Sequence, residues 1–417
     1  MNSITSSNKN ISFSSSLTIF SQTNCQSQIS ASKLLIDAKT INIFSTIIII
    51  VIGLIGNGLA VYVFSQKRFR LHSSRIYLLC LAISDGMFLI IHFFEDTLRT
   101  YIDVYLNIES DIDPNCYTNN QNHANNSNNL LRQLNITDRF LISCRIVNYF
   151  RYFLRFISAY IIVSFTIQRA IAIYSPFYQS KFKRKRMTWA IVTFIVLVSA
   201  ILNLWVPIFF NIRIKLNGDL QIEYCDIDKE YSTLYFSINI VYVALILFFP
   251  IIVIFFCNIL VIKNLIQANK NRSNMLNATF IDLKVIGTSK NSLLNTSTVV
   301  KPIMSKTSSL EEISLIGVNL MNNKGTTRLS HSNPNTTRML LLMSFSYSIL
   351  NLPYFVSWSM FFLRVAFNEQ LSLVERFKMF SILNICEIFY ILDYAIHFFI
   401  YCAAGKQFRG QLKNAFK

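Results

Sequence analysis

Charged side chains are scarce in this sequence. Asp, Glu, Lys and Arg make up 14% of its 417 residues, whereas roughly a quarter is usual for globular proteins. Hydrophobic residues make up 53%, and 36 of them are Phe. This balance excludes a disordered chain, a collagen and a small disulfide-stapled secreted domain, and it argues against most soluble enzymes.

The sequence also lacks the motifs of a catalytic or metal centre. It contains no Cys-x-x-Cys, no HExxH, no G-x-S-x-G and no phosphate-binding loop. Its five His residues are spread along the chain without the spacing of metal ligands. We therefore expect neither an enzyme nor a zinc domain.

Seven apolar stretches are present that are long enough to cross a bilayer, which takes about 20 residues. They are 41–64, 76–94, 144–174, 187–210, 231–262, 339–363 and 379–404. Backbone polar groups in lipid must satisfy one another, so each stretch is expected to be a helix. The sequence thus predicts an all-α membrane protein, with a seven-helix domain over 41–404 and a short cytoplasmic amphipathic helix in 405–417.

Basic residues gather at one end of the expected bundle. Four lie in 65–75, five in 181–186, and more in 263–338 and the C-terminal tail, whereas acids prevail between 95 and 139. Lys and Arg mark the cytoplasmic side, so the N-terminus is expected outside and the C-terminus inside. The net charge of +18 mostly reflects this asymmetry. It does not indicate nucleic-acid binding, because no basic segment outside the membrane carries stacking aromatics.

The polar segments fit this orientation. Residues 1–40 are rich in Ser and Asn and are expected to be a disordered extracellular tail, and about 264–337 a flexible cytoplasmic loop. Glycosylation sequons on the expected outer side stand at Asn10, Asn125 and Asn135. Four cysteines, Cys25, Cys116, Cys144 and Cys225, also lie outside, where disulfide pairing is expected.

Polar residues inside the apolar runs are costly in a membrane and therefore point to function. Asn57 follows Gly56 in the first run, and Asp85 ends the sequence LAISD in the second. Arg169 stands at the inner end of the third. These residues supply the landmarks for a comparison with known receptors.

The landmarks resemble those of rhodopsin-like (class A) G-protein-coupled receptors. Gly56-Asn57 is similar to the GN of their first span, and Leu81 to Asp85 resembles the LxxxD of their second. Cys144 stands 25 residues before Arg169, like the disulfide cysteine before the DRY arginine. Further anchors in register are Trp189, Cys225, Pro250, Leu352-Pro353-Tyr354, Tyr401 and Phe408-Arg409, and the resemblance covers about 40–417 without the long inner loop. Features resembling the peptide-receptor branch are Tyr-Ser-Pro-Phe at 174–177, Asn258 and FFIYC at 398–402.

The resemblance implies a plasma-membrane receptor for an extracellular neuropeptide, with heterotrimeric G protein, arrestin and membrane lipid as partners and no cofactor. It implies a Cys144–Cys225 disulfide, which leaves Cys25 and Cys116 as a second bridge or as two free thiols. The residues that it assigns to G-protein coupling are Arg169, Tyr401 and Asn258. A chemosensory receptor for a small anion and a receptor that signals without ligand are the alternatives within the family. A transporter or channel is the alternative outside it, although no internal repeat supports one.

Several positions depart from the family pattern. The DRY motif reads Gln168-Arg169-Ala170, so the acid that restrains the arginine is missing, and we expect raised ligand-independent signalling. Asn351 replaces the tryptophan two residues before the span 6 proline, and NPxxY reads as 397–401, HFFIY. Arg151 replaces the amine-binding aspartate, which argues against a monoamine receptor.

The expected ligand pocket contains both basic and acidic residues. Arg151 and Arg155 are four residues apart and share one helix face, which the resemblance turns toward the ligand cavity. Acids at a similar depth are Glu95, Asp96 and Glu387. They could neutralise the arginines in a structural network, or the arginines could bind an anionic group such as a peptide carboxyl terminus; the two interpretations are compatible.

A cation site inside the bundle is also implied. The family's span 2 aspartate binds sodium, and the matching residues here are Asp85, Ser158 and Asp393, with His397 nearby. Asp393 stands where the family usually has Asn. Two carboxylates in a low dielectric need a proton or a cation between them. The sequence leaves sodium or proton occupancy and an Asp–His pair as the two interpretations.

Overall fold

The computed structural model describes residues 7–66, 74–105, 136–174, 185–217, 220–264, 334–366 and 371–415, with a few helical residues between 266 and 274. Seven of its helical segments are long and apolar enough to cross a membrane. They are Cys25–Ser65, Ser74–Val104, Leu141–Ala172, Lys185–Phe209, Lys229–Asn264, Thr337–Arg364 and Leu373–Ala404. Each overlaps a predicted apolar run, which confirms the seven-helix bundle. They are called spans 1 to 7 below.

Helices make up nearly all of the described structure. They are α1 (Ser7–Ser65), α2 (Ser74–His92), α3 (Leu98–Tyr105), α5 (Ile136–Arg139), α6 (Leu141–Tyr174), α8 (Lys185–Leu202), α9 (Val206–Phe209), α10 (Ser232–Val243), α13 (Pro334–Ala366), α14 (Leu373–Ala404) and α15 (Lys406–Ala415). A 3-10 turn, η4 (Lys229–Tyr231), precedes α10, and two π turns, η2 (Phe93–Thr97) and η5 (Ala244–Phe248), follow α2 and α10. Spans 2 and 5 therefore each contain a π turn, a feature frequent near functional sites.

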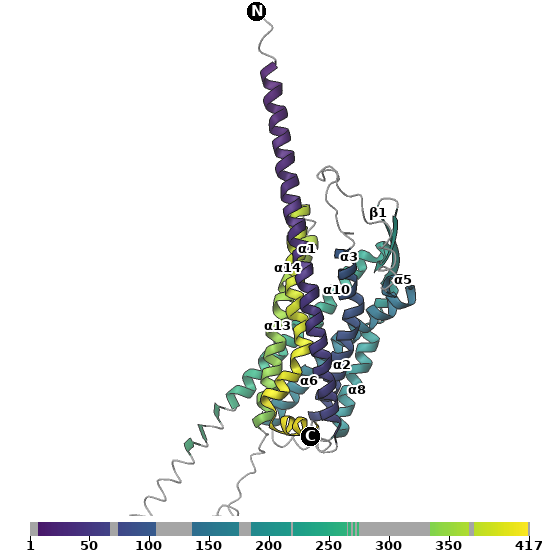
Figure 1. Ribbon diagram of the computed structural model, residues 1–417. Helices are drawn as coiled ribbons and strands as arrows, with labels where there is room; N and C mark the ends of the chain where they lie inside the picture. Colours follow the sequence, from purple (N-terminus) through teal and green to yellow (C-terminus); the bar gives the residue numbers. More distant parts are fainter. Residues whose placement is uncertain are drawn as a thin grey trace, which may run out of the picture.

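The long helices lie side by side, with the N-terminus and α15 at opposite ends of the bundle (Figure 1). Helix α1 packs along α14 and α2. A Cβ atom at Gly53 would come within 2.6 Å of Leu89 and 2.8 Å of Ala395, so glycine permits the close approach of these three helices. Asn57 donates a hydrogen bond to the carbonyl of Tyr394 at 3.0 Å. The glycine-rich part of α1 is thus a packing surface, and Asn57 fastens it to α14.

Helix α1 begins far ahead of the predicted boundary at residue 41. It starts at Ser7, so the expectation of a disordered tail is wrong for the residues that follow. Ala31 and Leu35 are buried, lie one helical turn apart, and pack against Phe377 of α14. This apolar contact stabilises the helix beyond the apolar run, and the Ser- and Asn-rich composition concealed it.

The segment between spans 4 and 5 forms an antiparallel hairpin, which the all-α prediction did not include. Strand β1 (Phe210–Asn217) pairs with β2 (Leu220–Ile227), so that Phe210 lies opposite Ile227 and Asn217 opposite Leu220. Apolar and polar residues alternate along 210–217, and Asn217 is followed by a glycine. Such a pattern indicates a β-hairpin. The all-α prediction did not include it, because the long apolar runs on either side of it indicate helices.

The short helix expected after span 7 is present as α15. Phe408 on this helix is buried, and its ring centroid lies 5.3 Å from that of Phe64 and 5.7 Å from that of Tyr401. Aromatic packing therefore holds α15 against the ends of α1 and α14.

Candidate functional site

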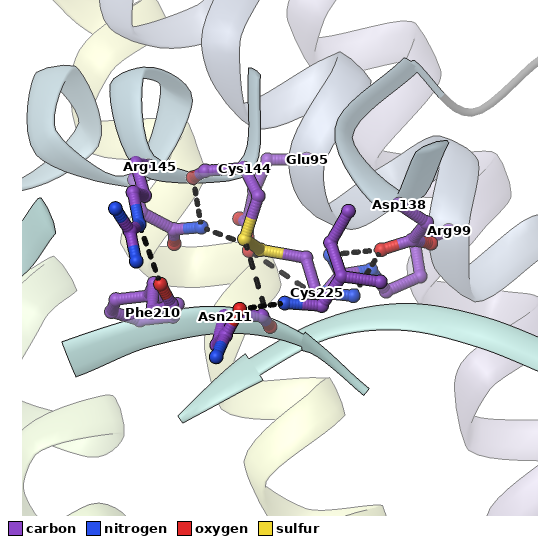
Figure 2. Close-up of a disulfide and its surroundings, with 10 residues drawn as sticks. Glu95, Arg99, Asp138, Cys144, Arg145, Phe210, Asn211 and Cys225 are labelled. Carbon is purple, nitrogen blue, oxygen red and sulfur yellow. Dashed lines mark hydrogen bonds and ion pairs between the residues drawn. A yellow bond between two sulfur atoms is a disulfide. The ribbon is translucent and has the colours of Figure 1, made fainter. Parts of the chain in front are cut away.

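A disulfide ties the β-hairpin to the bundle. Cys144, in the first turn of α6, is bonded to Cys225 of β2, and both residues are fully or almost fully buried. Next to it, Arg145 donates a hydrogen bond to the backbone carbonyl of Phe210 at 3.1 Å (Figure 2). The bridge that the resemblance implied is present, and it fixes both strands beside the start of span 3.

Asp138 adds a second link that sequence reasoning missed. Its Oδ1 accepts a hydrogen bond from the backbone N–H of Cys225 at 2.8 Å and another from Arg99 at 2.7 Å. Figure 2 shows Asp138 between Arg99 and Cys225. The three residues come from α3, α5 and β2, and no sequence pattern connects these elements. Their contact joins the ends of spans 2 and 3 to the hairpin.

A cavity of about 260 Å³ lies between the helices and the end of the hairpin where the first residue of β1 pairs with the last residue of β2. Phe210 and Ile227 line it from the hairpin, and Arg151 and Arg155 line it from α6. Glu95 is its acidic residue. The other polar residues of its wall are two asparagines and five tyrosines: Asn148, Asn239, Tyr152, Tyr235, Tyr242, Tyr354 and Tyr390. The structure thus confirms that the two arginines share a face, and it places that face on a cavity.

Arg151 belongs to an ion-pair network, as the structural interpretation predicted. Its guanidinium donates to Glu95, and lies 4.0 Å from a carboxylate oxygen of Asp96 and 4.0 Å from one of Glu387. Glu95 also lies 3.8 Å from Arg99. Asp96 and Glu387 do not line the cavity, so they are neighbours of the pocket rather than part of its wall.

Arg155 has different surroundings. Its guanidinium carbon lies 4.9 Å from the ring centroid of Tyr390 and 5.8 Å from that of Phe88. Its Nε is buried without a hydrogen-bond partner. No carboxylate among the described residues forms an ion pair with it. The cavity therefore contains one arginine that is neutralised and one that is held only by aromatic faces.

The expected cation site is a compact polar cluster deep in the bundle. Asp85 is completely buried; its carboxylate accepts a hydrogen bond from Ser158 at 2.7 Å, and its other oxygen lies 2.8 Å from Nδ1 of His397. Asp393 accepts a hydrogen bond from Asn351 at 3.0 Å. Two departures from the family pattern, Asn351 and Asp393, thus contact each other. The geometry favours the Asp–His pair, and sodium at Asp85, Ser158 and Asp393 stays a prediction.

Arg169 lies at the α15 end of the bundle, without a carboxylate partner among the described residues. It donates a hydrogen bond to Ser74 in the first turn of α2, and its guanidinium lies 5.4 Å from the ring centroid of Phe165. Gln168, which replaces the family's acid, is buried. A hydrogen bond from the guanidinium to an uncharged hydroxyl thus stands where the family has an ion pair.

Tyr401 and Asn258 occupy the same end of the molecule. Tyr401 is fully buried, its hydroxyl has no partner, and its ring contacts Phe64 at 5.2 Å between centroids. Asn258 donates a hydrogen bond to Ser344 of α13 at 2.9 Å. Both residues connect different spans, as residues involved in a helix rearrangement would.

One cluster near the cavity was not anticipated. His92, Asp96 and Glu387 each offer an atom able to bind a metal, and these atoms lie within 4.8 Å of one another. The spacing of four between His92 and Asp96 places them on one side of the helix. Glu387 comes from α14, and the sequence gives no sign that it lies beside them.

The remaining predictions concern the second disulfide, the glycosylation sites and the long inner loop, most of which lie outside the described residues. Cys25 is disulfide-bonded, whereas Cys116 lies outside the described residues, so their mutual pairing stays a prediction. Asn10 lies in α1, and Asn125 and Asn135 are outside the described residues. Their glycosylation stays a prediction, and so does a flexible loop over 264–337, most of which is also outside.

Comparison with known proteins identifies a family. The family model described as "7 transmembrane receptor (rhodopsin family)" matches residues 129–401. The match includes the disulfide, both cavity arginines, Arg169 and Tyr401. None of the curated proteins compared with the chain matches it.

Proposed function

Because the chain belongs to the rhodopsin family of seven-transmembrane receptors, we propose that it is a plasma-membrane receptor for an extracellular neuropeptide and that it signals through heterotrimeric G proteins. Membership makes it a signalling receptor rather than an enzyme. The distribution of Lys and Arg supports an outer N-terminus, which puts the hairpin and cavity outside and α15 in the cytoplasm.

The surroundings of Arg155 support an anionic ligand. A guanidinium removed from water is costly unless a negative group compensates it. Aromatic faces provide only part of that compensation, about 0.5–2 kcal/mol. An anionic ligand group in the cavity would provide the rest. Arg151 is a weaker candidate, because Glu95, Asp96 and Glu387 already surround it.

The tyrosines around Arg155 support the same conclusion. The hydroxyls of Tyr152 and Tyr235 lie 2.6 Å apart, and Tyr242 donates to the carbonyl of Tyr152 at 2.8 Å. Each tyrosine has one O–H, so the Tyr152–Tyr235 pair keeps one hydroxyl hydrogen that can be donated to a carboxylate oxygen near the guanidinium. The carboxyl terminus of a peptide fits this wall, with the rest of the peptide extending toward the hairpin. A small carboxylate is the competing ligand.

A screen of peptides and small carboxylates, with parallel cAMP and calcium measurements, tests this assignment. For the first active compound, we expect Arg155→Gln to lower potency by about 10- to 100-fold, the usual range for losing a hydrogen bond to a charged group. Arg155→Lys should recover part of the loss, since it keeps the charge without the planar fork. A peptide hit should lose potency when its carboxyl terminus is amidated.

Arg139→Gln serves as the matched control, because Arg139 lies over Phe140 and does not line the cavity. Full potency in Arg155→Gln, at normal surface expression, would contradict the anion assignment. If the hits are small carboxylates and no peptide is active, the receptor is chemosensory, and the neuropeptide proposal fails.

Coupling to the G protein is proposed to depend on the α15 end of the bundle. There an agonist would favour an arrangement in which span 6 moves outward, through its greater affinity for that state. Arg169 and Tyr401 would stabilise the open arrangement, and Asn258 would have to release Ser344. Arrestin would use the same opened surface.

Basal activity should respond to the residue before Arg169. An acid at that position would restrain Arg169 in the resting state more strongly than the hydrogen bond to Ser74 does. A gain of about 1 kcal/mol for the resting state would lower basal signalling roughly fivefold. We therefore expect Gln168→Asp to reduce ligand-independent cAMP or calcium signalling. Gln168→Asn is the neutral control, and an equal basal level in both variants at equal expression would disprove the restraint.

A further inference from the structure

We propose that His92, Asp96 and Glu387 form a zinc-binding site between spans 2 and 7. The three ligand atoms, one from each residue, lie within 4.8 Å of one another. His92 and Asp96 come from the end of α2 and from η2, and Glu387 comes from α14. The proposal does not depend on which ligand enters the cavity.

Among the described residues, His92 has no close hydrogen-bond partner. It is 1% exposed, and its Nδ1 is buried without a hydrogen bond. Its Nε2 lies 3.8 Å from a carboxylate oxygen of Asp96, too far for a hydrogen bond. A buried imidazole without partners is uncommon in folded proteins, and an ion or a water is the usual explanation.

The two carboxylates are incompletely neutralised. The close hydrogen bond of Arg151 goes to Glu95, and that of Arg99 goes to Asp138. Asp96 and Glu387 have the guanidinium of Arg151 only at 4.0 Å, the edge of an ion pair. Other cations that act on this region are Lys39, on Asp96, and Arg155, on His92. Their charges are shared with Asp103 and with the cavity, so negative charge remains for a bound cation.

One imidazole and two carboxylates favour zinc over the other common divalent ions. Nitrogen and oxygen ligands in threes, with water in a fourth position, are typical of open zinc sites. Calcium and magnesium prefer oxygen ligands alone. Asn42 of α1 donates to Glu387 at 3.2 Å, as outer residues often do to orient a metal ligand.

Binding requires small side-chain movements and an entry path. Ligand atoms in a tetrahedral zinc site lie about 3.4 Å apart, since each is about 2.1 Å from the metal. The present separations, which reach up to 4.8 Å, must therefore shrink by roughly 1 Å through rotation of the Asp96 and Glu387 side chains. The side chain of Asp96 is 27% exposed, and it gives the ion access from solvent.

A zinc ion at this place would connect the outer ends of spans 2 and 7. It would stabilise the arrangement of α2 and α14 that brings the three side chains together, by a free energy that grows with the logarithm of the ratio of ion concentration to dissociation constant. Because Arg151 lies 4.0 Å from both carboxylates and lines the cavity, the ion would replace these two longer ion pairs and leave Arg151 bonded to Glu95 alone.

The test uses the purified full-length receptor and zinc chloride alone. We expect saturable zinc binding by calorimetry and a higher melting temperature with zinc, but no shift with magnesium chloride. Asp96→Asn and Glu387→Gln preserve side-chain shape, and each should weaken zinc affinity by about 10- to 100-fold. His92→Phe should abolish the binding.

Controls separate this site from adventitious thiol or surface binding. Cys386→Ala removes the free thiol next to Glu387, and His123→Ala removes a histidine outside the described residues. Both variants should bind zinc like the unmodified receptor. Absence of zinc binding at millimolar concentration would overturn the proposal. So would unchanged affinity in Asp96→Asn and Glu387→Gln, which remain informative if His92→Phe does not fold.

Discussion

Replacing Cys144 by alanine is expected to remove the receptor from the cell surface. The bridge to Cys225 closes a loop across a sequence separation of 81 residues. In a chain-entropy model, a loop of this size contributes about 4–5 kcal/mol. That is a large part of the 5–15 kcal/mol by which folded proteins are typically stable. The variant should be retained inside the cell, and purified protein should unfold at a clearly lower temperature.

An epitope at residue 5 measures the outcome. On intact cells it should bind antibody in the unmodified receptor and not in Cys144→Ala, whereas an epitope at the C-terminus should be reached only after permeabilisation. Cys257→Ala is the matched control, because Cys257 is a free cysteine in span 5. Normal surface level and normal melting temperature in Cys144→Ala would show that the bridge is dispensable. Antibody access to the C-terminus of intact cells would reverse the proposed orientation.

Replacing His397 by asparagine, the residue that the family usually has there, is expected to make the receptor depend on sodium. In the structure, Asp85 is 0% exposed and His397 is its basic partner at 2.8 Å. Breaking a buried charge pair by removing one partner costs about 3–5 kcal/mol. Sodium can restore the missing charge, helped by Ser158 and Asp393. The melting temperature of His397→Asn should therefore rise with sodium concentration, and its basal signalling should depend on sodium. Both quantities should be nearly independent of sodium in the unmodified receptor.

The opposite pattern would support the family's sodium site. In that case sodium would affect the unmodified receptor and not Asp85→Asn, with choline chloride keeping the ionic strength constant. A response to pH at constant sodium would indicate a proton shared by Asp85, Asp393 and His397. The double variant Asp85→Asn/His397→Asn should be more stable than His397→Asn, because it removes the carboxylate of Asp85 that the single variant leaves without its basic partner. If the double variant is no more stable than His397→Asn, Asp85 and His397 do not stabilise the fold as a pair.

The sequence predicted those parts of the structure that depend on single segments. Seven apolar runs determined seven helices, because the membrane allows little else. The spacing from Cys144 to Arg169 and the position of Cys225 led to the right disulfide only through the resemblance to a family. Arg151 and Arg155 were assigned to one face because their spacing of four fixes it.

Contacts between distant segments could not be predicted in the same way. Arg151 and Arg155 look equivalent in sequence, yet Glu95 neutralises one of them and Tyr390 covers the other. Asn351 and Asp393 were seen as separate departures, and only the packing of α13 on α14 shows that they bond to each other. His92 had no visible role until Glu387 was placed beside it.

The double attachment of the hairpin divides the cavity wall into a fixed and a movable side. Cys225 is tied covalently to span 3 and, through Asp138 and Arg99, to span 2, so these parts behave as one rigid frame. Tyr354 and Trp358 reach the same cavity from α13, next to Pro353, where the helix lacks one backbone donor and bends more easily. A ligand that contacts the frame therefore also contacts spans 5, 6 and 7, of which span 6 contains this proline. A more rigid frame would transmit more of the ligand's binding energy to the α15 end of the bundle.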